Sequence, residues 1–141
     1  MNILPISATE FKKRLAQLCL TSNSPELPRR QRDRQIVLKS IALCLSKDRA
    51  YTEQEINAAL ASWTAEVGHS LEVDHVTLRR SLIDEKYLER SEDGSLYRLS
   101  IPFCADWFAA EVDGIDPCLV IEQSIDDARA KRAQYRNRND S

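Results

Sequence analysis

The sequence predicts a mostly α-helical fold with a small β-hairpin (α+β), and three observations within residues 51–99 lead to this prediction. A capped helical pattern follows Tyr51, and a second one follows a connector that contains Gly68. Asp93-Gly94 then separates two short runs with apolar residues, which is a hairpin signal because the favoured turns need positive φ. Helix, connector, helix and hairpin, in this order, form the second half of a winged helix-turn-helix.

The first of these helices begins with a capping box. Thr52 is placed to accept a hydrogen bond from the first turn, and Glu55 is placed to reach back to the cap N–H. The residues behind the box form one apolar stripe at helical spacing: Ile56, Ala59, Leu60, Trp63 and Val67. We expect Gly68 to end this helix, because glycine tolerates the left-handed conformation of a C-terminal cap.

The second helix is expected to begin at the cap residue Asp74 and to reach about residue 84 or 85. At about 100° per residue, one side gathers His75, Val76, Leu78, Leu82 and Ile83, and the other gathers Thr77, Arg80, Ser81 and Asp84. Arg79 falls on the apolar side of this helix. We therefore expect it to be a structural residue whose guanidinium pairs with Glu53 or Glu55 of the preceding helix.

The hairpin is expected to have strands at 88–91 and 96–99, with residues 92–95 as the tip of the wing. At these residues the sequence resembles a known family. The resemblance is carried by Tyr51-Thr52-Glu53, Glu55, Asn57, Leu60, Asp74-His75, Leu78-Arg79-Arg80, Leu82, Asp84, Leu88, Arg90, Gly94 and Tyr97-Arg98. The family is a prokaryotic domain of unknown function that occurs alone or appended to ArsR-type transcriptional regulators. The resemblance covers about residues 27–100, and it implies a winged-helix-like fold with a role at nucleic acid.

Extensions are expected on both sides of this domain. Residues 1–26 are interpreted as a helix, capped by Ser7 and Glu10, followed by a linker. Within residues 27–100, Pro28 is expected to open a strongly buried first helix that ends near residues 46–49. Residues 101–141 are expected to form an acidic segment with an apolar cover, followed by a basic helix that Ser124 caps.

Composition narrows the classes of function. The chain has 141 residues, 43% of them hydrophobic and 30% charged, and a formal net charge of −2, so bulk charge does not make it a polyanion binder. Its cysteines are scattered (Cys19, Cys44, Cys104 and Cys118), which favours buried, inert thiols over a zinc site. Neither a cofactor nor a small-molecule ligand is expected. The sequence shows no membrane span and no signal peptide, so we expect a cytoplasmic protein of a prokaryote.

The first functional hypothesis is binding to double-stranded DNA, possible for a winged helix whose second helix enters the major groove. On this hypothesis Thr77, Arg80 and Ser81 contact the bases. Phosphate contacts come from a cluster of arginines that precedes the first buried helix: Arg29, Arg30, Arg32 and Arg34.

The alternative hypothesis is a winged helix that serves as a protein-interaction or dimerisation module without DNA binding. Residues 28–50 carry seven basic and two acidic residues, whereas residues 101–128 carry seven acidic and no basic ones. The two blocks are complementary, either within one chain or across a homodimer, and another protein is a further partner of this kind. Phe103, Trp107 and Phe108 are then the apolar anchors of the interface. An enzyme is not expected, because no pairing of a base with a nucleophile is visible.

Overall fold

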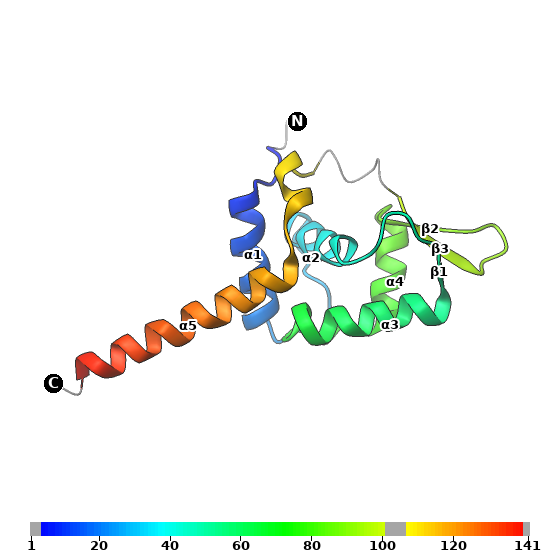
Figure 1. The fold of residues 1–141 in the computed structure, drawn as a ribbon. Coiled ribbons are helices and arrows are strands. Elements are labelled where there is room, and N and C mark those ends of the chain that lie inside the picture. The colour runs from blue at the N-terminus through cyan, green and yellow to red at the C-terminus, as the bar shows by residue number, and fades with distance from the viewer. Residues whose placement is uncertain (1–3, 101–106, 140–141) are drawn as a thin grey trace.

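The computed structural model describes residues 4–100 and 107–139 (Figure 1). In chain order its elements are α1 (Ala8–Thr21), α2 (Gln31–Leu43), β1 (Tyr51–Thr52), α3 (Glu53–Trp63), the π-helical turn η1 (Thr64–Gly68), α4 (His75–Asp84), β2 (Leu88–Arg90), β3 (Leu96–Leu99), the 3-10 turn η2 (Ala110–Gly114) and α5 (Pro117–Asn139). The predicted mostly helical α+β class is confirmed.

The central part of the chain is a winged helix-turn-helix. Its elements follow the order α2, β1, α3, α4, β2 and β3, and the antiparallel sheet has the strand order β1-β3-β2. Tyr51 faces Tyr97 across β1 and β3, and Leu88 faces Leu99 across β2 and β3. Gly94 has a φ of 77°, as the hairpin turn requires. The two-residue strand β1 is too short to show an alternating pattern in the sequence.

Side-chain N-caps define where these helices begin. Both halves of the capping box are present at α3, where the Glu55 amide donates to Thr52 Oγ1 at 3.2 Å and Glu55 Oε1 accepts from the Thr52 amide at 3.0 Å. At α4, Asp74 Oδ1 accepts from the Thr77 amide at 2.8 Å. At α1, the hydroxyl of Ser7 accepts from the Glu10 amide. Each cap satisfies an amide that would otherwise lack a partner in the first turn.

The end of α3 differs from the expectation. The helical path does continue to Gly68, but the residue with positive φ is His69, at 36°. Glycine is required at position 68 by packing instead, because a Cβ built on it would lie 2.7 Å from Cζ3 of Trp63. The missing side chain therefore lets the backbone lie directly against the indole ring.

The predicted apolar face of α4 is partly wrong. Leu78 and Leu82 are buried and Ile83 is partly buried, but His75 is exposed and Val76 is 39% exposed. Both exceptions lie in the first turn, which extends beyond the buried stripe. Helical periodicity alone cannot show where along a helix the packing begins.

The N-terminal extension and the C-terminal segment meet in a parallel β-bridge between Ile6 and Phe108. The Ile6 amide donates to Trp107 O at 2.8 Å, and the Ala109 amide donates to Ile6 O at 2.9 Å. The Phe108 ring is buried and stands edge-on to Phe11 of α1, with the ring centroids 6.1 Å apart. These contacts join the N-terminal extension to the segment that precedes η2.

Two helix starts are displaced from their expected positions. α2 begins at Gln31 instead of near Pro28, and it ends at Leu43, before the expected residues 46–49. α5 begins at Pro117 instead of beyond Ser124. Asp116 Oδ1 accepts from the Cys118 amide at 3.0 Å and so caps α5, while Pro117 fits the first turn because it has no N–H to satisfy.

The outer part of α5 projects away from the rest of the molecule (Figure 1). Ile121 is buried and Ile125 is half-buried, whereas every side chain from Asp126 to Asn137 is exposed. α5 packs on α1 and η1 through its first turns only.

Candidate nucleic-acid interface

The outward face of α4 is the site that the sequence predicts. Leu78 and Leu82 turn the other face towards the core, so Thr77, Arg80 and Asp84 are exposed to solvent. Ser81 is half-buried at the edge of this face. Among the described residues, no carboxylate pairs with the guanidinium of Arg80. The helix therefore presents one unpaired cation between two exposed polar positions.

Thr77 also has a structural role at the start of α4. Its hydroxyl donates to Asp74 Oδ2 at 3.2 Å, and its amide donates to Asp74 Oδ1 at 2.8 Å. The backbone hydrogen bond from Thr77 is the main reason that the pKa of Asp74 is lowered. Asp74 is therefore ionised at neutral pH, and it places a negative charge beside the predicted base-reading residues.

Arg79 lies between α4 and α3, with 17% of its side chain exposed. Its Nη1 donates to Asn57 Oδ1 at 2.7 Å and lies 3.5 Å from Oε1 of Glu53, one of the two carboxylates expected. The guanidinium also lies 5.7 Å from the ring centroid of Tyr97 in β3. Arg79 thus joins both helices of the helix-turn-helix to the wing.

The arginine cluster before α2 is divided between surface and structure. Arg29 and Arg30 are exposed. Arg32, in contrast, binds both carboxylate oxygens of Glu10 at 2.5 Å and 2.6 Å and also donates to Leu4 O at 2.9 Å. Arg34 pairs with Glu85 at the end of α4, at 3.2 Å. Two of the four arginines predicted to contact phosphate, Arg32 and Arg34, thus form ion pairs that link α2 to α1 and to α4.

The Arg34–Glu85 pair brings the start of α2 beside the end of α4. Gln35 Nε2 strengthens this junction with a hydrogen bond of 3.0 Å to Glu85 Oε2. Arg30 is the residue directly before α2. The structure thus brings the start of α2 and the end of α4 together, although Gln35 and Glu85 are 50 positions apart in the chain.

The wing tip is acidic. Asp93 Oδ1 accepts hydrogen bonds from the Ser91 hydroxyl at 2.6 Å, the Ser95 amide at 3.0 Å and the Ser95 hydroxyl at 2.8 Å. These bonds, the one from Ser91 first, lower the pKa of Asp93 to about 2. The neighbouring Glu92 is also exposed. A tip of this charge does not approach phosphate closely, so α4 is the better candidate for contact with DNA.

One ion pair within the chain joins the basic block (residues 28–50) to the acidic block (residues 101–128). Lys39 of the basic block pairs with Asp113 of the acidic block at 2.7 Å, and its ammonium lies 5.3 Å from the centroid of the Phe108 ring. A separate bidentate pair, which sequence reasoning missed, joins Arg14 of α1 to Asp33 of α2 at 3.1 Å and 2.8 Å. Of the three predicted interface aromatics, Trp107 is half-buried, Phe108 is buried and Phe103 lies outside the described residues.

The cysteines differ from the expectation of uniformly buried thiols. Cys19 is buried, and burial raises its pKa to about 12. Cys118 is half-buried and its thiol donates to Glu66 Oε2 at 3.4 Å, whereas Cys44 is exposed. Cys104 lies outside the described residues. In the described part of the chain, no three His, Cys, Asp or Glu side chains are grouped as metal ligands.

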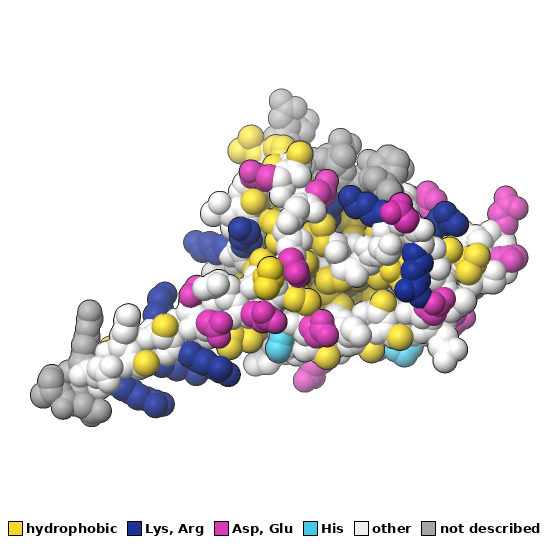
Figure 2. Space-filling view, in the orientation of Figure 1, with side chains coloured by type: hydrophobic (Ala, Val, Ile, Leu, Met, Phe, Trp, Pro, Cys, Tyr) yellow, Lys and Arg dark blue, Asp and Glu magenta, His cyan; other side chains and the backbone are white. Residues whose placement is uncertain are grey.

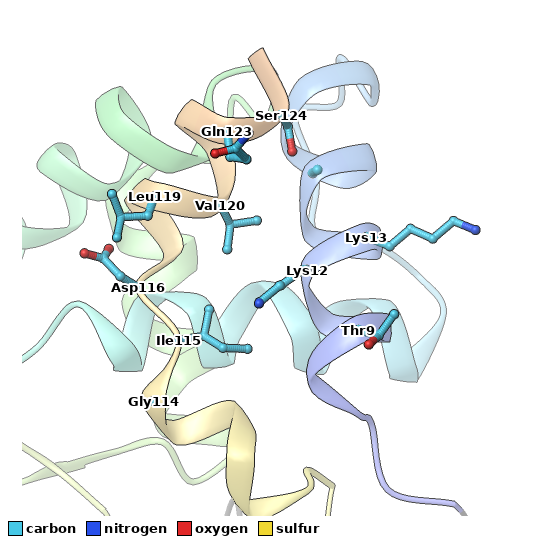
Figure 3. A pocket seen from close by; sticks show the side chains of 11 residues that line it. Thr9, Lys12, Lys13, Gly114, Ile115, Asp116, Leu119, Val120, Gln123 and Ser124 are labelled. Atoms are coloured by element: carbon cyan, nitrogen blue, oxygen red, sulfur yellow. The ribbon is translucent and has the colours of Figure 1, made fainter. Parts of the chain in front are cut away.

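An open groove of about 690 Å³ lies between α1 and α5 (Figure 3). Leu119 and Val120 of α5 line it, and Lys12 and Thr9 of α1 face them. Leu119 is 61% exposed although it is a large apolar residue. The groove brings together apolar side chains, the cations of Lys12 and Lys13 and the carboxylate of Asp116.

The fold and this face define a winged helix-turn-helix protein with helical extensions. The chain belongs to a family described as "uncharacterized protein conserved in bacteria" (DUF2087), whose sequence profile matches residues 25–99. No curated protein and no solved structure matches the chain. Within the described residues, every helix is too short or too polar to cross a lipid bilayer.

Proposed function

We propose that the chain is a DNA-binding winged-helix protein, with α4 as the helix that enters the major groove. The observation that carries the proposal is the uncovered outward face of α4, on which Arg80 is exposed and unpaired between Thr77 and Asp84. An arginine at the centre of such a face suits the O6 and N7 acceptors of guanine. A regulatory role in transcription and a cytoplasmic location belong to this proposal.

Arg29 and Arg30 supply phosphate contacts at the end of the same face. Both are exposed, and the Arg34–Glu85 pair fixes the start of α2 beside the end of α4. Arg32 and Arg34 are left out of the interface, because their pairing with Glu10 and Glu85 leaves little positive charge for phosphate.

The test is fluorescence anisotropy of labelled duplexes at about 50 mM and about 200 mM salt, a range over which phosphate contacts weaken strongly. Arg80→Ala is expected to weaken binding to a selected site by about 1–3 kcal/mol and to relax one base position. Arg30→Ala is expected to weaken binding to all duplexes and to reduce the salt slope by about 1.

Lys13→Ala is the matched control, because Lys13 is an exposed cation on α1, in the groove with α5. This variant is expected to leave the affinity for duplexes and the salt slope unchanged. The proposal is wrong if the wild-type protein binds no duplex at the lower salt concentration.

The second candidate is a protein-docking module, and the acidic wing favours it. Asp93 stays ionised because its pKa is about 2, and Glu92 lies beside it. A basic protein surface suits this tip better than a phosphate backbone does. Under this alternative, Glu92→Lys weakens capture of a partner and leaves DNA affinity unchanged or higher.

A further inference from the structure

The projecting helix α5 carries charge of opposite sign in its two halves. Glu122, Asp126 and Asp127 precede residue 128, whereas Arg129, Lys131, Arg132 and Arg136 follow it. Figure 2 shows acidic side chains where α5 leaves the body and basic side chains along its outer part. A helix charged in this way is complementary to a second copy that runs in the opposite direction.

One face of α5 is exposed from Leu119 to Arg136. The face consists of six residues spaced alternately three and four apart, here called the α5 stripe: Leu119, Glu122, Asp126, Arg129, Ala133 and Arg136. This spacing places them in one row, as at the seam of a two-helix coiled coil. The residues that α5 turns towards its own body, including Ile121 and Ile125, lie outside the stripe.

We propose that α5 pairs antiparallel with α5 of a second copy of this chain through the α5 stripe. In this arrangement Asp126 faces the partner's Arg129, and Arg129 faces the partner's Asp126. Glu122 lies against the partner's Ala133, one turn from the partner's Arg136. The small side chain of Ala133 allows close approach, and the two-fold axis passes the helix near residue 128.

The charges select this direction of pairing. A parallel pair in register would place Glu122, Asp126, Arg129 and Arg136 each against its own copy, and like charges at these positions repel. The antiparallel pair instead sets Asp126 against Arg129 in both directions and places Glu122 one turn from the partner's Arg136. It also lays the polar end of each helix over the exposed Leu119 of the other, at the groove between α1 and α5 (Figure 3).

The proposal is independent of DNA binding, and its test is the oligomeric state of the full chain. Light scattering at about 100 μM protein and about 50 mM salt is expected to give twice the chain mass of 16.1 kDa. Because exposed charges provide the attraction, the dissociation constant is expected to rise about tenfold or more at about 500 mM salt.

Two charge-reversal variants make the test specific. Glu122→Lys with Asp126→Lys makes the stripe wholly basic, and Arg129→Glu with Arg136→Glu makes it wholly acidic. Each variant alone is expected to be a monomer, and an equimolar mixture is expected to form a one-to-one dimer. All four side chains are exposed, so circular dichroism should show the wild-type helix content in both variants.

The control reverses charges on another face of α5. Asp127→Lys and Lys131→Glu change residues outside the stripe, and each is expected to leave the dimer intact. A wild-type monomer under the low-salt condition overturns the proposal, as does a dimer that survives either stripe variant. If the wild type is a monomer and Arg129→Glu with Arg136→Glu weakens DNA binding, the basic half of α5 serves phosphate instead, and the dimer proposal fails while the proposed function stands.

Discussion

The indole Nε1 of Trp63 donates a hydrogen bond of 3.0 Å to the hydroxyl of Ser40 in the interior of the protein. The same hydroxyl donates to Val37 O at 2.6 Å, so it is satisfied in both directions. Ser40 is fully buried and Trp63 is 2% exposed, so both bonds are shielded from bulk solvent. This pair fixes the distance between α2 and α3, and therefore the position of the helix-turn-helix on the core.

Ser40→Ala is expected to lower the free energy of unfolding by about 1–3 kcal/mol, because it leaves the buried indole N–H without an acceptor. Chemical denaturation measures the change. Ser62→Ala, at an exposed position of α3, should stay within about 0.5 kcal/mol of the wild type. A Ser40→Ala protein as stable as the control would show that another acceptor serves the indole.

Arg79→Ala is expected to reduce stability by about 1–3 kcal/mol, mainly through loss of the charged hydrogen bond to Asn57. The ion pair with Glu53 adds little, because 59% of the Glu53 side chain is exposed. Thermal unfolding followed by circular dichroism tests this. The neighbouring Arg80→Ala is the control, and equal melting temperatures for the two variants would contradict the structural role of Arg79.

Gly68→Ala is expected to destabilise the protein by about 1–3 kcal/mol, because the new Cβ would lie 2.7 Å from Cζ3 of Trp63. Gly114→Ala is the matched control, because a Cβ there meets no atom within 4 Å. Denaturation midpoints of the two variants should differ clearly, with Gly114→Ala at or above the wild type. Similar midpoints would mean that the indole moves aside without cost.

Phe108→Ala is expected to cost about 3–5 kcal/mol, because it empties the space against Phe11 and removes the ring beneath Lys39. Tyr135→Ala removes an aromatic ring that is 70% exposed, and it should change stability by less than about 0.5 kcal/mol. Urea denaturation measures the free energy of unfolding of both variants. Equal stability would show that residues 107–108 are not part of the core.

Stability at acid pH is expected to depend on the pair of Glu10 and Arg32. The hydrogen bond from Arg32 lowers the pKa of Glu10 below its ordinary value of 4.5. The unfolded chain therefore binds the proton more readily, so this pair stabilises the fold above about pH 4.5, and the contribution is lost as pH falls through the lower, folded pKa. Glu10→Gln should make the decline of stability between about pH 5 and pH 3 shallower. Arg32→Gln should do the same, and an unchanged decline in both would exclude the pair as a cause.

The features that the sequence predicted correctly depend on neighbours within a few residues. The Thr52–Glu55 box, the Asp74 cap and the Gly94 turn each need contacts over two or three residues, so a local pattern suffices. The start of α5 was missed because Ser124 and Asp116 are both good cap residues, and only packing of Ile121 on the core favours Asp116. The strand β1 exists only because Tyr51 pairs with Tyr97, 46 residues later.

The candidate site was predictable in part for the same reason. Helical periodicity placed Thr77 and Arg80 outside and Arg79 inside. It gave no sign that Glu10 lies against Arg32 or Glu85 against Arg34, because these pairs join different helices. Two arginines that look equivalent in sequence, such as Arg30 and Arg32, therefore have different surroundings.

The bridge between Ile6 and Phe108 has a consequence for the order of folding. Within residues 31–99 the elements of the winged helix contact one another, as α3 does with α4, whereas the neighbouring bond from the Ala8 amide to Glu111 joins groups 103 residues apart. Closing so long a loop is unfavourable until the surface that receives both ends exists. The two ends should therefore dock last and detach first. In hydrogen exchange, the amides of Ile6 and Ala109 should then open together, at a lower free energy than the amides of α2.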